Sequence, residues 1–136
     1  MENRTTTDLQ KGAQSCAPRR WQAFKQRLNS LAPREFARHL QNGQAITLID
    51  VRTPEEYQAS HLPGAINISY LTPDLWDQLE QLPPQGRYYV YCRTERRALR
   101  VCLLMQNGGF GEVYNLDGGL LAWEQEMGAA YREAQR

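Results

Sequence analysis

Short hydrophobic runs alternate with helical stripes along most of the chain. The run at residues 45–51 is typical of a strand buried on both faces, and the runs at 87–92 and 112–116 predict two further strands. Between them, hydrophobic residues recur every three or four positions, as in Ala98, Val101, Cys102 and Met105, which is the spacing of one helix face. Prolines at first helical positions predict further helices that begin near Pro33, Pro54 and Pro73, and a last helix is predicted over residues 120–127. Strands that alternate with helices predict an α/β domain with a mostly parallel sheet.

Turn and cap signals refine this pattern. Thr53, Pro54 and Glu56 stand in the order of an N-cap, a first helical proline and an acid at the third position, so a short helix is predicted there. A turn at Pro63-Gly64 leads into a further strand within residues 61–68.

The first 30 residues differ in composition from the rest. They carry six Lys or Arg against two acids, a net charge of +4, whereas residues 31–136 carry ten Arg against thirteen acids, a net charge of −3. We therefore divide the chain into a basic extension over residues 1–30 and a domain over 31–130. The extension is predicted to be disordered up to about residue 18. Trp21, Phe24, Leu28 and Leu31 then predict a helix over 21–31, packed on the domain or, alternatively, bound to a partner or a membrane surface.

Composition excludes several classes of protein. Hydrophobic residues make up 41% and charged residues 23% of 136 residues, as in a globular domain. A net charge of +1 argues against a general nucleic-acid binder, and no apolar stretch approaches the ~20 residues of a membrane span or forms a secretory signal. Three widely spaced cysteines form no disulfide framework, which predicts a cytoplasmic protein. His39 and His61 have no metal-ligand spacing, so no metal is expected.

Chemistry is predicted at residues 92–97, which join a buried strand to a helix. A loop that enters a helix presents unpaired backbone N–H groups, which bind anions. Arg93, Arg96 and Arg97 crowd the same helix start, where the helix dipole disfavours each cation by roughly 0.3–1 kcal/mol. The arginines are therefore expected to surround an anion, and the same field favours a nucleophilic Cys92 thiolate. Cys102 falls on the core stripe and Cys16 in the extension, so neither is the expected nucleophile.

Five motifs, in order, resemble those of a single-domain rhodanese, a thiosulfate sulfurtransferase-like protein. They are Ile49-Asp50-Val51-Arg52, Glu55-Glu56-Tyr57, His61-Leu62-Pro63-Gly64-Ala65-Ile66-Asn67, Tyr91-Cys92-Arg93-Thr94, and Leu116-Asp117-Gly118-Gly119 ahead of Ala122-Trp123. The resemblance implies a five-stranded parallel sheet flanked by helices, with the cysteine loop as catalytic site and no cofactor.

The resemblance also implies a double displacement through a Cys92 persulfide. A donor such as thiosulfate would give its sulfane sulfur to Cys92, and a thiol, a protein thiol partner or cyanide would accept it. Substrate binding would fall to the loop residues Arg93, Thr94, Glu95, Arg96 and Arg97. Asp50 and Arg52 are interpreted as a supporting buried pair near the base of the loop, and His61 and Asp117 as supporting or turn residues.

One position departs from the family pattern, because Glu95 stands where many of these sulfurtransferases have glycine. A carboxylate there lowers the positive charge of the loop and alters a turn that glycine forms at low cost, since φ > 0 suits glycine. We expect Glu95 either to repel an anionic donor or to hold the loop in shape through a neighbouring arginine.

Two other functions remain alternatives. A cysteine phosphatase or arsenate reductase has five residues between cysteine and arginine, whereas four separate Cys92 from Arg97. A catalytically silent rhodanese-like module that binds a partner is the second alternative, favoured by Glu95 and the basic extension.

Overall fold

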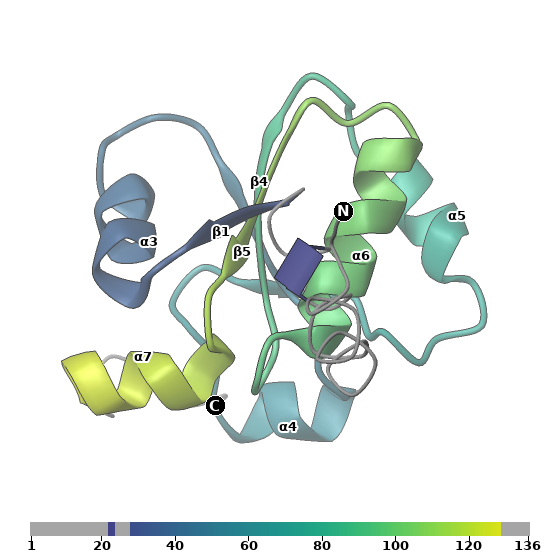
Figure 1. The fold of residues 1–136 in the computed structure, drawn as a ribbon. Helices are drawn as coiled ribbons and strands as arrows, with labels where there is room; N and C mark the ends of the chain where they lie inside the picture. Colours follow the sequence, from purple (N-terminus) through teal and green to yellow (C-terminus); the bar gives the residue numbers. More distant parts are fainter. Residues whose placement is uncertain (1–21, 24–27, 129–136) are drawn as a thin grey trace, which may run out of the picture.

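The computed structural model describes residues 22–23 and 28–128. Their centre is an all-parallel sheet of five strands in the order β1–β5–β4–β2–β3 (Figure 1). The strands are β1 (Asn29–Leu31), β2 (Thr47–Asp50), β3 (Ile66–Asn67), β4 (Arg87–Tyr91) and β5 (Glu112–Leu116). This confirms the predicted α/β class and the five parallel strands implied by the rhodanese resemblance. It also puts β4 in the middle of the sheet, so the residue that follows β4 lies at the centre of one sheet edge.

Helices cover both faces of the sheet. They are α3 (Pro33–Leu40), α4 (Pro54–Ala59), α5 (Leu75–Glu80), α6 (Arg96–Asn107) and α7 (Gly119–Met127). In Figure 1, α5 and α6 lie on one side of the sheet and α3 and α7 on the other, while α4 lies near the starts of α6 and α7. The amino ends of three helices are thereby gathered at the carboxyl edge of the sheet, where ligands of such folds bind.

The side chains of β4 alternate between two hydrophobic cores. Tyr88 and Val90 pack with α5 and α6, whereas Tyr89 and Tyr91 pack with α3 and α7. All four are at most 1% exposed, as expected for a central parallel strand covered on both faces. Cys92 continues the alternation and faces the α6 side.

The predicted helix over residues 21–31 is wrong at its end, because Asn29–Leu31 forms β1. This strand pairs in parallel with Tyr114–Leu116 of β5. Leu28 and Leu31, three positions apart, pack in opposite cores, as strand residues of odd spacing do. Backbone hydrogen bonds to the edge of β5 stabilise the strand, and they outweigh the helical spacing of the four hydrophobic residues that predicted a helix. Residues 22–23 are helical; residues 21 and 24–27 of that predicted helix, and the disorder predicted up to residue 18, lie outside the described residues.

Two helix starts show how far the cap signals can be used. At α4 the capping box is complete: Glu56 N–H donates to Thr53 Oγ1 at 3.2 Å, and Thr53 N–H donates to Glu56 Oε1 at 3.0 Å. At α5 the helix begins at Leu75, two residues after Pro73, because residues 72–75 form a turn in which Leu75 N–H donates to the Thr72 carbonyl at 3.2 Å.

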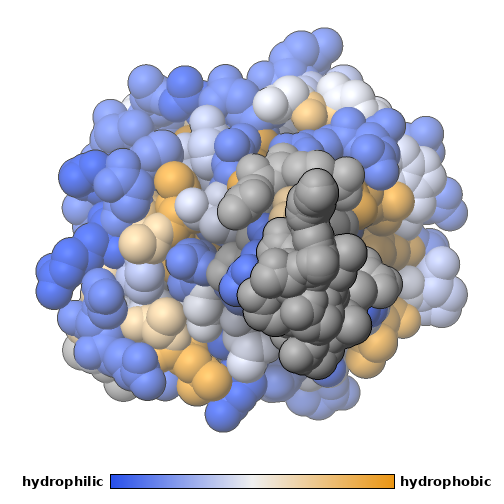
Figure 2. Space-filling view, viewed as in Figure 1, coloured by the Kyte–Doolittle hydropathy of each residue, from blue (hydrophilic) through white to orange (hydrophobic). Residues whose placement is uncertain are grey.

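The described surface is mainly polar. Figure 2 shows hydrophilic residues around the rim of one face, with hydrophobic residues in small groups between them. Within the described residues, no helix is long and apolar enough to cross a membrane.

Candidate active site

Cys92 lies between the end of β4 and the start of α6. Its Sγ accepts hydrogen bonds from the backbone N–H groups of Glu95, at 3.1 Å, and Ala98, at 3.4 Å. The residue is 2% exposed. Glu95 is the N-cap of α6 and Ala98 lies in its first turn, so both donors belong to the amino end of a 12-residue helix. The sulfur therefore accepts two backbone hydrogen bonds at the positive end of the helix dipole.

The amino end of α7 holds the backbone of the loop from the other side. Leu120 N–H donates to the Cys92 carbonyl at 2.9 Å and Leu121 N–H to the Arg93 carbonyl at 3.1 Å. Gly119 allows this close approach, because a Cβ there would lie 2.4 Å from the Arg93 carbonyl oxygen. Helix α7 therefore binds two carbonyl groups of the loop, while the N–H groups of Glu95 and Ala98 bind the Cys92 sulfur.

Glu95 has an unusual backbone conformation. Its φ of +122° is the one positive φ of a non-glycine residue among residues 22–23 and 28–128. Such a conformation costs about 1–3 kcal/mol for a residue with a Cβ. The Glu95 carboxylate accepts a hydrogen bond from Gly118 N–H, at 2.8 Å from Oε1. A hydrogen bond to a charged group contributes about 1.5–3 kcal/mol, which is enough to offset the backbone cost.

The other loop residues are exposed to solvent, namely Arg93, Thr94, Arg96 and Arg97. The Arg97 guanidinium carbon lies 5.9 Å from the centre of the Tyr70 ring. Arg100, one turn further along α6, donates to the Tyr70 hydroxyl at 3.0 Å. The loop therefore carries three exposed arginines within five positions of Cys92, namely Arg93, Arg96 and Arg97.

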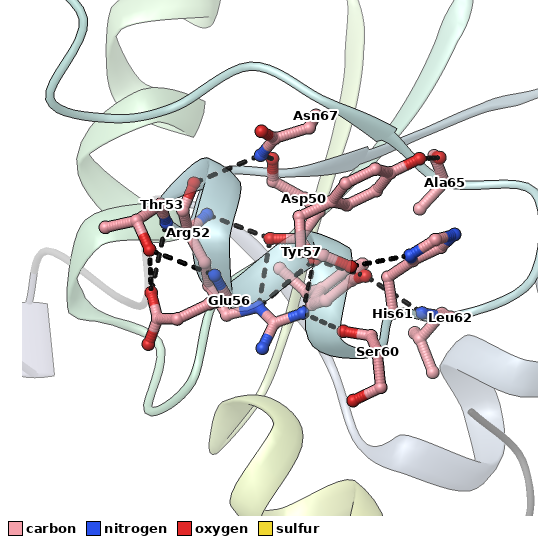
Figure 3. A network of polar contacts seen from close by, with 11 residues as sticks. Asp50, Arg52, Thr53, Glu56, Tyr57, Ser60, His61, Leu62, Ala65 and Asn67 are labelled. Atoms are coloured by element: carbon pink, nitrogen blue, oxygen red, sulfur yellow. Dashed lines mark hydrogen bonds and ion pairs between the residues drawn. The ribbon is translucent and has the colours of Figure 1, made fainter. Parts of the chain in front are cut away.

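The predicted supporting pair, Asp50 and Arg52, is buried (Figure 3), and Asp50 pairs in the sheet with Tyr91, the residue before Cys92. Arg52 Nη2 lies 2.7 Å from Asp50 Oδ2 and also donates to the Ser60 carbonyl at 2.7 Å. The Tyr91 hydroxyl donates to Asp50 Oδ2 at 2.7 Å and accepts from Leu62 N–H at 3.1 Å. Burial lowers the pKa of Arg52, but its hydrogen bond and its attraction to Asp50 outweigh burial and raise that pKa. The pair is an ion pair that fixes the strand end next to Cys92.

His61, the third supporting residue, is also buried. Its ring stacks on that of Tyr57 with centroids 3.9 Å apart, and its Nδ1–H donates to the Tyr57 carbonyl at 2.8 Å. The Tyr57 hydroxyl in turn donates to the Ala65 carbonyl at 2.5 Å. These contacts join α4 to the segment that leads into β3 (Figure 3), so His61 has a structural position.

The two other cysteines differ from Cys92. Burial raises the pKa of the Cys102 thiol, which lies in the core on α6, as its place on the helical stripe predicted. Cys16 lies outside the described residues. No group of three or more His, Cys, Asp or Glu that could hold a metal ion occurs in the described part of the chain.

Three features of the site were not predicted from the sequence. The N–H of Ala98 reaches Cys92 from within α6, and Gly118 and Gly119 bring α7 against the loop. The sequence does contain a signal for this close approach, because a glycine pair directly before a helix lets two backbones come close together. From the sequence alone, the pair indicates only a tight turn. No feature of the sequence pattern predicts that the Tyr91 hydroxyl binds Asp50.

Comparisons with known proteins agree with this fold. A family model described as "Rhodanese-like domain" matches residues 32–126. The chain is 31% identical over 99 residues to the "Probable adenylyltransferase/sulfurtransferase MoeZ" of Mycobacterium tuberculosis, a match that covers 73% of this chain and 25% of MoeZ. It is 28% identical over 97 residues to a "Sulfurtransferase" of Allochromatium vinosum, covering 71% of this chain and 88% of that protein.

Solved structures give the same result. The crystal structure of a rhodanese-like domain protein from Staphylococcus aureus has a TM-score of 0.69 at 25% identity, covering 80% of this chain and 100% of that chain. The chain therefore belongs to the rhodanese-like domain family, and its relatives include proteins named sulfurtransferases.

Proposed function

We propose that this protein is a sulfurtransferase that carries a sulfane sulfur as a persulfide on Cys92. The observation that supports this most directly is the pair of backbone N–H groups on Cys92 Sγ, from Glu95 at 3.1 Å and Ala98 at 3.4 Å. Donors that stabilise a thiolate also stabilise the negative charge of a persulfide in the same place. Exposed arginines around the loop would attract an anionic donor such as thiosulfate.

The reaction would have two displacements. The Cys92 thiolate attacks the sulfane sulfur of thiosulfate, a new S–S bond forms to Cys92, and sulfite leaves with the electron pair of the broken S–S bond. A thiol or cyanide then attacks the terminal sulfur of the persulfide. The electron pair of the Cys92 S–S bond returns to Cys92, cyanide leaves as thiocyanate, and a thiol, including a protein thiol, leaves as a persulfide.

Each loop residue has a proposed role in this scheme. Arg93 and Arg97 would neutralise charge that builds up on the transferring sulfur and on leaving sulfite. Arg96 and Thr94, both exposed at the loop, would bind the donor. The backbone N–H of Glu95 would bind the nucleophilic sulfur, since it already donates to Cys92 Sγ.

Intact-mass spectrometry after incubation with thiosulfate tests the proposal. The wild-type protein should gain the mass of one sulfur atom, and cyanide should remove that sulfur as thiocyanate. Cys92→Ser should show no gain, whereas Cys102→Ala and Cys16→Ser should gain sulfur like the wild type. A gain of wild-type size in Cys92→Ser would contradict the assignment.

The same experiment separates the two alternative functions. A silent partner-binding module would gain no sulfur from thiosulfate or from a small-molecule persulfide. A phosphatase would hydrolyse an aryl phosphate through Cys92 and gain no sulfur.

A further inference from the structure

We propose that the Glu95 side chain is a positioning residue for the cysteine loop: by binding Gly118 N–H, it keeps two backbone donors on Cys92 Sγ. The inference deepens the proposed function and rests on it for the catalytic effect. The positioning itself can be measured on the reactivity of Cys92, which does not depend on any sulfur donor.

The first step concerns the backbone of Glu95. Its N–H donates to Cys92 Sγ at 3.1 Å, and it does so from a φ of +122°. The next N–H on the sulfur, that of Ala98 at 3.4 Å, follows three residues later in the first turn of α6. The orientation of both donors therefore depends on the chain turning at residue 95 into a conformation that a residue with a Cβ rarely adopts.

The second step concerns the side chain. Glu95 Oε1 lies 2.8 Å from the nitrogen of Gly118, the N-cap of α7. The next two N–H donors of α7 with partners in the loop, those of Leu120 and Leu121, bind the carbonyls of Cys92 and Arg93. Three bonds from one helix end thus fix residues 92, 93 and 95. The carboxylate supplies the bond at the residue where the backbone is strained.

The third step concerns charge. A carboxylate that faced the substrate would repel thiosulfate, and its removal would speed the reaction. The observed contact gives the carboxylate a different partner, the amino end of α7, where the helix dipole stabilises negative charge. If Glu95 positions the loop, removal of its carboxylate should slow the reaction. If Glu95 repels thiosulfate, the same removal should speed the reaction.

Three substitutions at this position separate backbone strain, hydrogen bond and charge. Glu95→Ala keeps the strained turn and removes the hydrogen bond, whereas Glu95→Gly removes both the strain and the bond. Glu95→Gln keeps an oxygen acceptor for Gly118 and removes only the charge. Glu80→Ala, which removes one exposed carboxylate from the end of α5, is the matched control for net charge.

The first measurement is the rate at which iodoacetamide alkylates Cys92, followed peptide by peptide across a pH series. The second is kcat and KM for thiosulfate. Other charged groups on the segments around Cys92 stay the same in all variants, so differences report residue 95. They are Arg93, Arg96 and Arg97 on the loop and α6, Asp117 before α7, and the buried pair Asp50 and Arg52.

Glu95→Ala should lower the alkylation rate at neutral pH and kcat by about tenfold each, because a charge-assisted hydrogen bond is lost. KM should change less, because the exposed arginines remain. Glu95→Gly should also alkylate more slowly than the wild type although its backbone is unstrained. Glu95→Gln should stay within about threefold of the wild type, and Glu80→Ala should be unchanged.

Equal or faster alkylation in Glu95→Gly, together with an equal or higher kcat, would overturn the proposal and favour repulsion of the donor. If Glu95→Ala does not fold, Glu95→Gly and Glu95→Gln still decide the matter. A wild-type protein that never accepts sulfur, but whose Cys92 alkylation depends on residue 95 as expected, would overturn the sulfurtransferase function and leave the positioning role standing.

Discussion

Tyr91 and Cys92, adjacent at the end of β4, lead to two polar regions of opposite character. The side chain of Tyr91 enters the Asp50 cluster, composed of Asp50, Arg52, Ser60 and Tyr91, in which donors end on acceptors of the protein itself. Cys92 enters the cysteine loop, residues 92–97, where two N–H groups converge on one sulfur and the arginines are exposed.

This difference separates structure from chemistry. The charges of the Asp50 cluster neutralise each other inside the protein, so the cluster stabilises one conformation and has little capacity for an incoming anion. The cysteine loop has exposed arginines and two N–H donors on the Cys92 sulfur, an arrangement that suits an anion that arrives and leaves. Substitutions in the first region should change stability, and substitutions in the second should change turnover.

The largest effect is expected for Asp50→Ala. It leaves the Arg52 guanidinium buried without its carboxylate and removes the acceptor of the Tyr91 hydroxyl. Breaking a buried ion pair costs about 3–5 kcal/mol in the free energy of unfolding. Urea denaturation measures the loss, with Glu80→Ala as a surface control. A loss below about 1 kcal/mol would show that the pair contributes little to the stability of this edge of the sheet.

Arg93→Ala and Arg97→Ala should lower kcat/KM for thiosulfate by roughly 10- to 1,000-fold, the range for losing one strong electrostatic donor. The melting temperature should stay nearly constant, because a cation leaves the amino end of a helix. Arg34→Ala, an exposed arginine on α3, is the control for net charge. Intact activity with a collapsed melting temperature would assign the loop arginines to structure instead.

Tyr91→Phe should sharpen the comparison within a single strand. It removes the hydroxyl that joins Asp50 to the buried N–H of Leu62, which leaves that N–H without its acceptor. The expected loss in the free energy of unfolding is about 1–3 kcal/mol. Alkylation of Cys92 in the folded protein should be unchanged. A strong change in that rate would show that the two regions are coupled through β4.

Thr53→Ala removes the N-cap of α4 and should cost about 1 kcal/mol at neutral pH. Hydrogen bonds from the Thr53 backbone N–H and, to a smaller extent, from the Thr53 hydroxyl lower the pKa of Glu56 below its ordinary 4.5, and Thr53→Ala removes only the hydroxyl bond. A lowered folded-state pKa gives stability that is present above 4.5 and is lost as the pH falls through the folded-state value. The difference between wild type and Thr53→Ala should therefore shrink in acid. Urea titrations at neutral and acidic pH check this, and a difference that grows in acid would contradict it.

Removal of residues 1–20 should have the smallest effect, because Met1 and Leu9 are the only large hydrophobic residues in this segment. Folding and thiosulfate turnover should both remain near wild type. A shortened protein that fails to fold, by circular dichroism, would show that the domain needs residues before Trp21.

Sequence alone predicted the central strands and most helices because burial on both faces leaves runs such as residues 87–92 nearly free of charge. It missed β1 for a physical reason. Asn29 and Ser30 have polar side chains, and the strand exists because the backbone edge of β5 pairs with it and Asn115 donates to Ser30 Oγ at 3.0 Å. The reason that residues 29–31 form a strand therefore lies in their partner strand, β5, and not in these three residues themselves.

The site was predicted in the same uneven way. A cysteine followed by arginines at a strand-to-helix junction is a local pattern, so Cys92 and its neighbours could be proposed as a candidate site from the sequence. The partner of Glu95 is Gly118, 23 positions later, and no local pattern links the two residues. The sequence showed that glycine was missing at position 95; the structure shows which contact accompanies its replacement.

The parallel order of the sheet has a consequence for the growing chain. Ser30 pairs with Asn115, 85 positions later, and the loop around Cys92 is completed by N–H groups of Leu120 and Leu121. Contacts so distant in sequence form late, since a long loop must close before they contribute. During synthesis Cys92 therefore leaves the ribosome before the backbone that encloses it, and a chain interrupted after α6 would carry Cys92 without its enclosure.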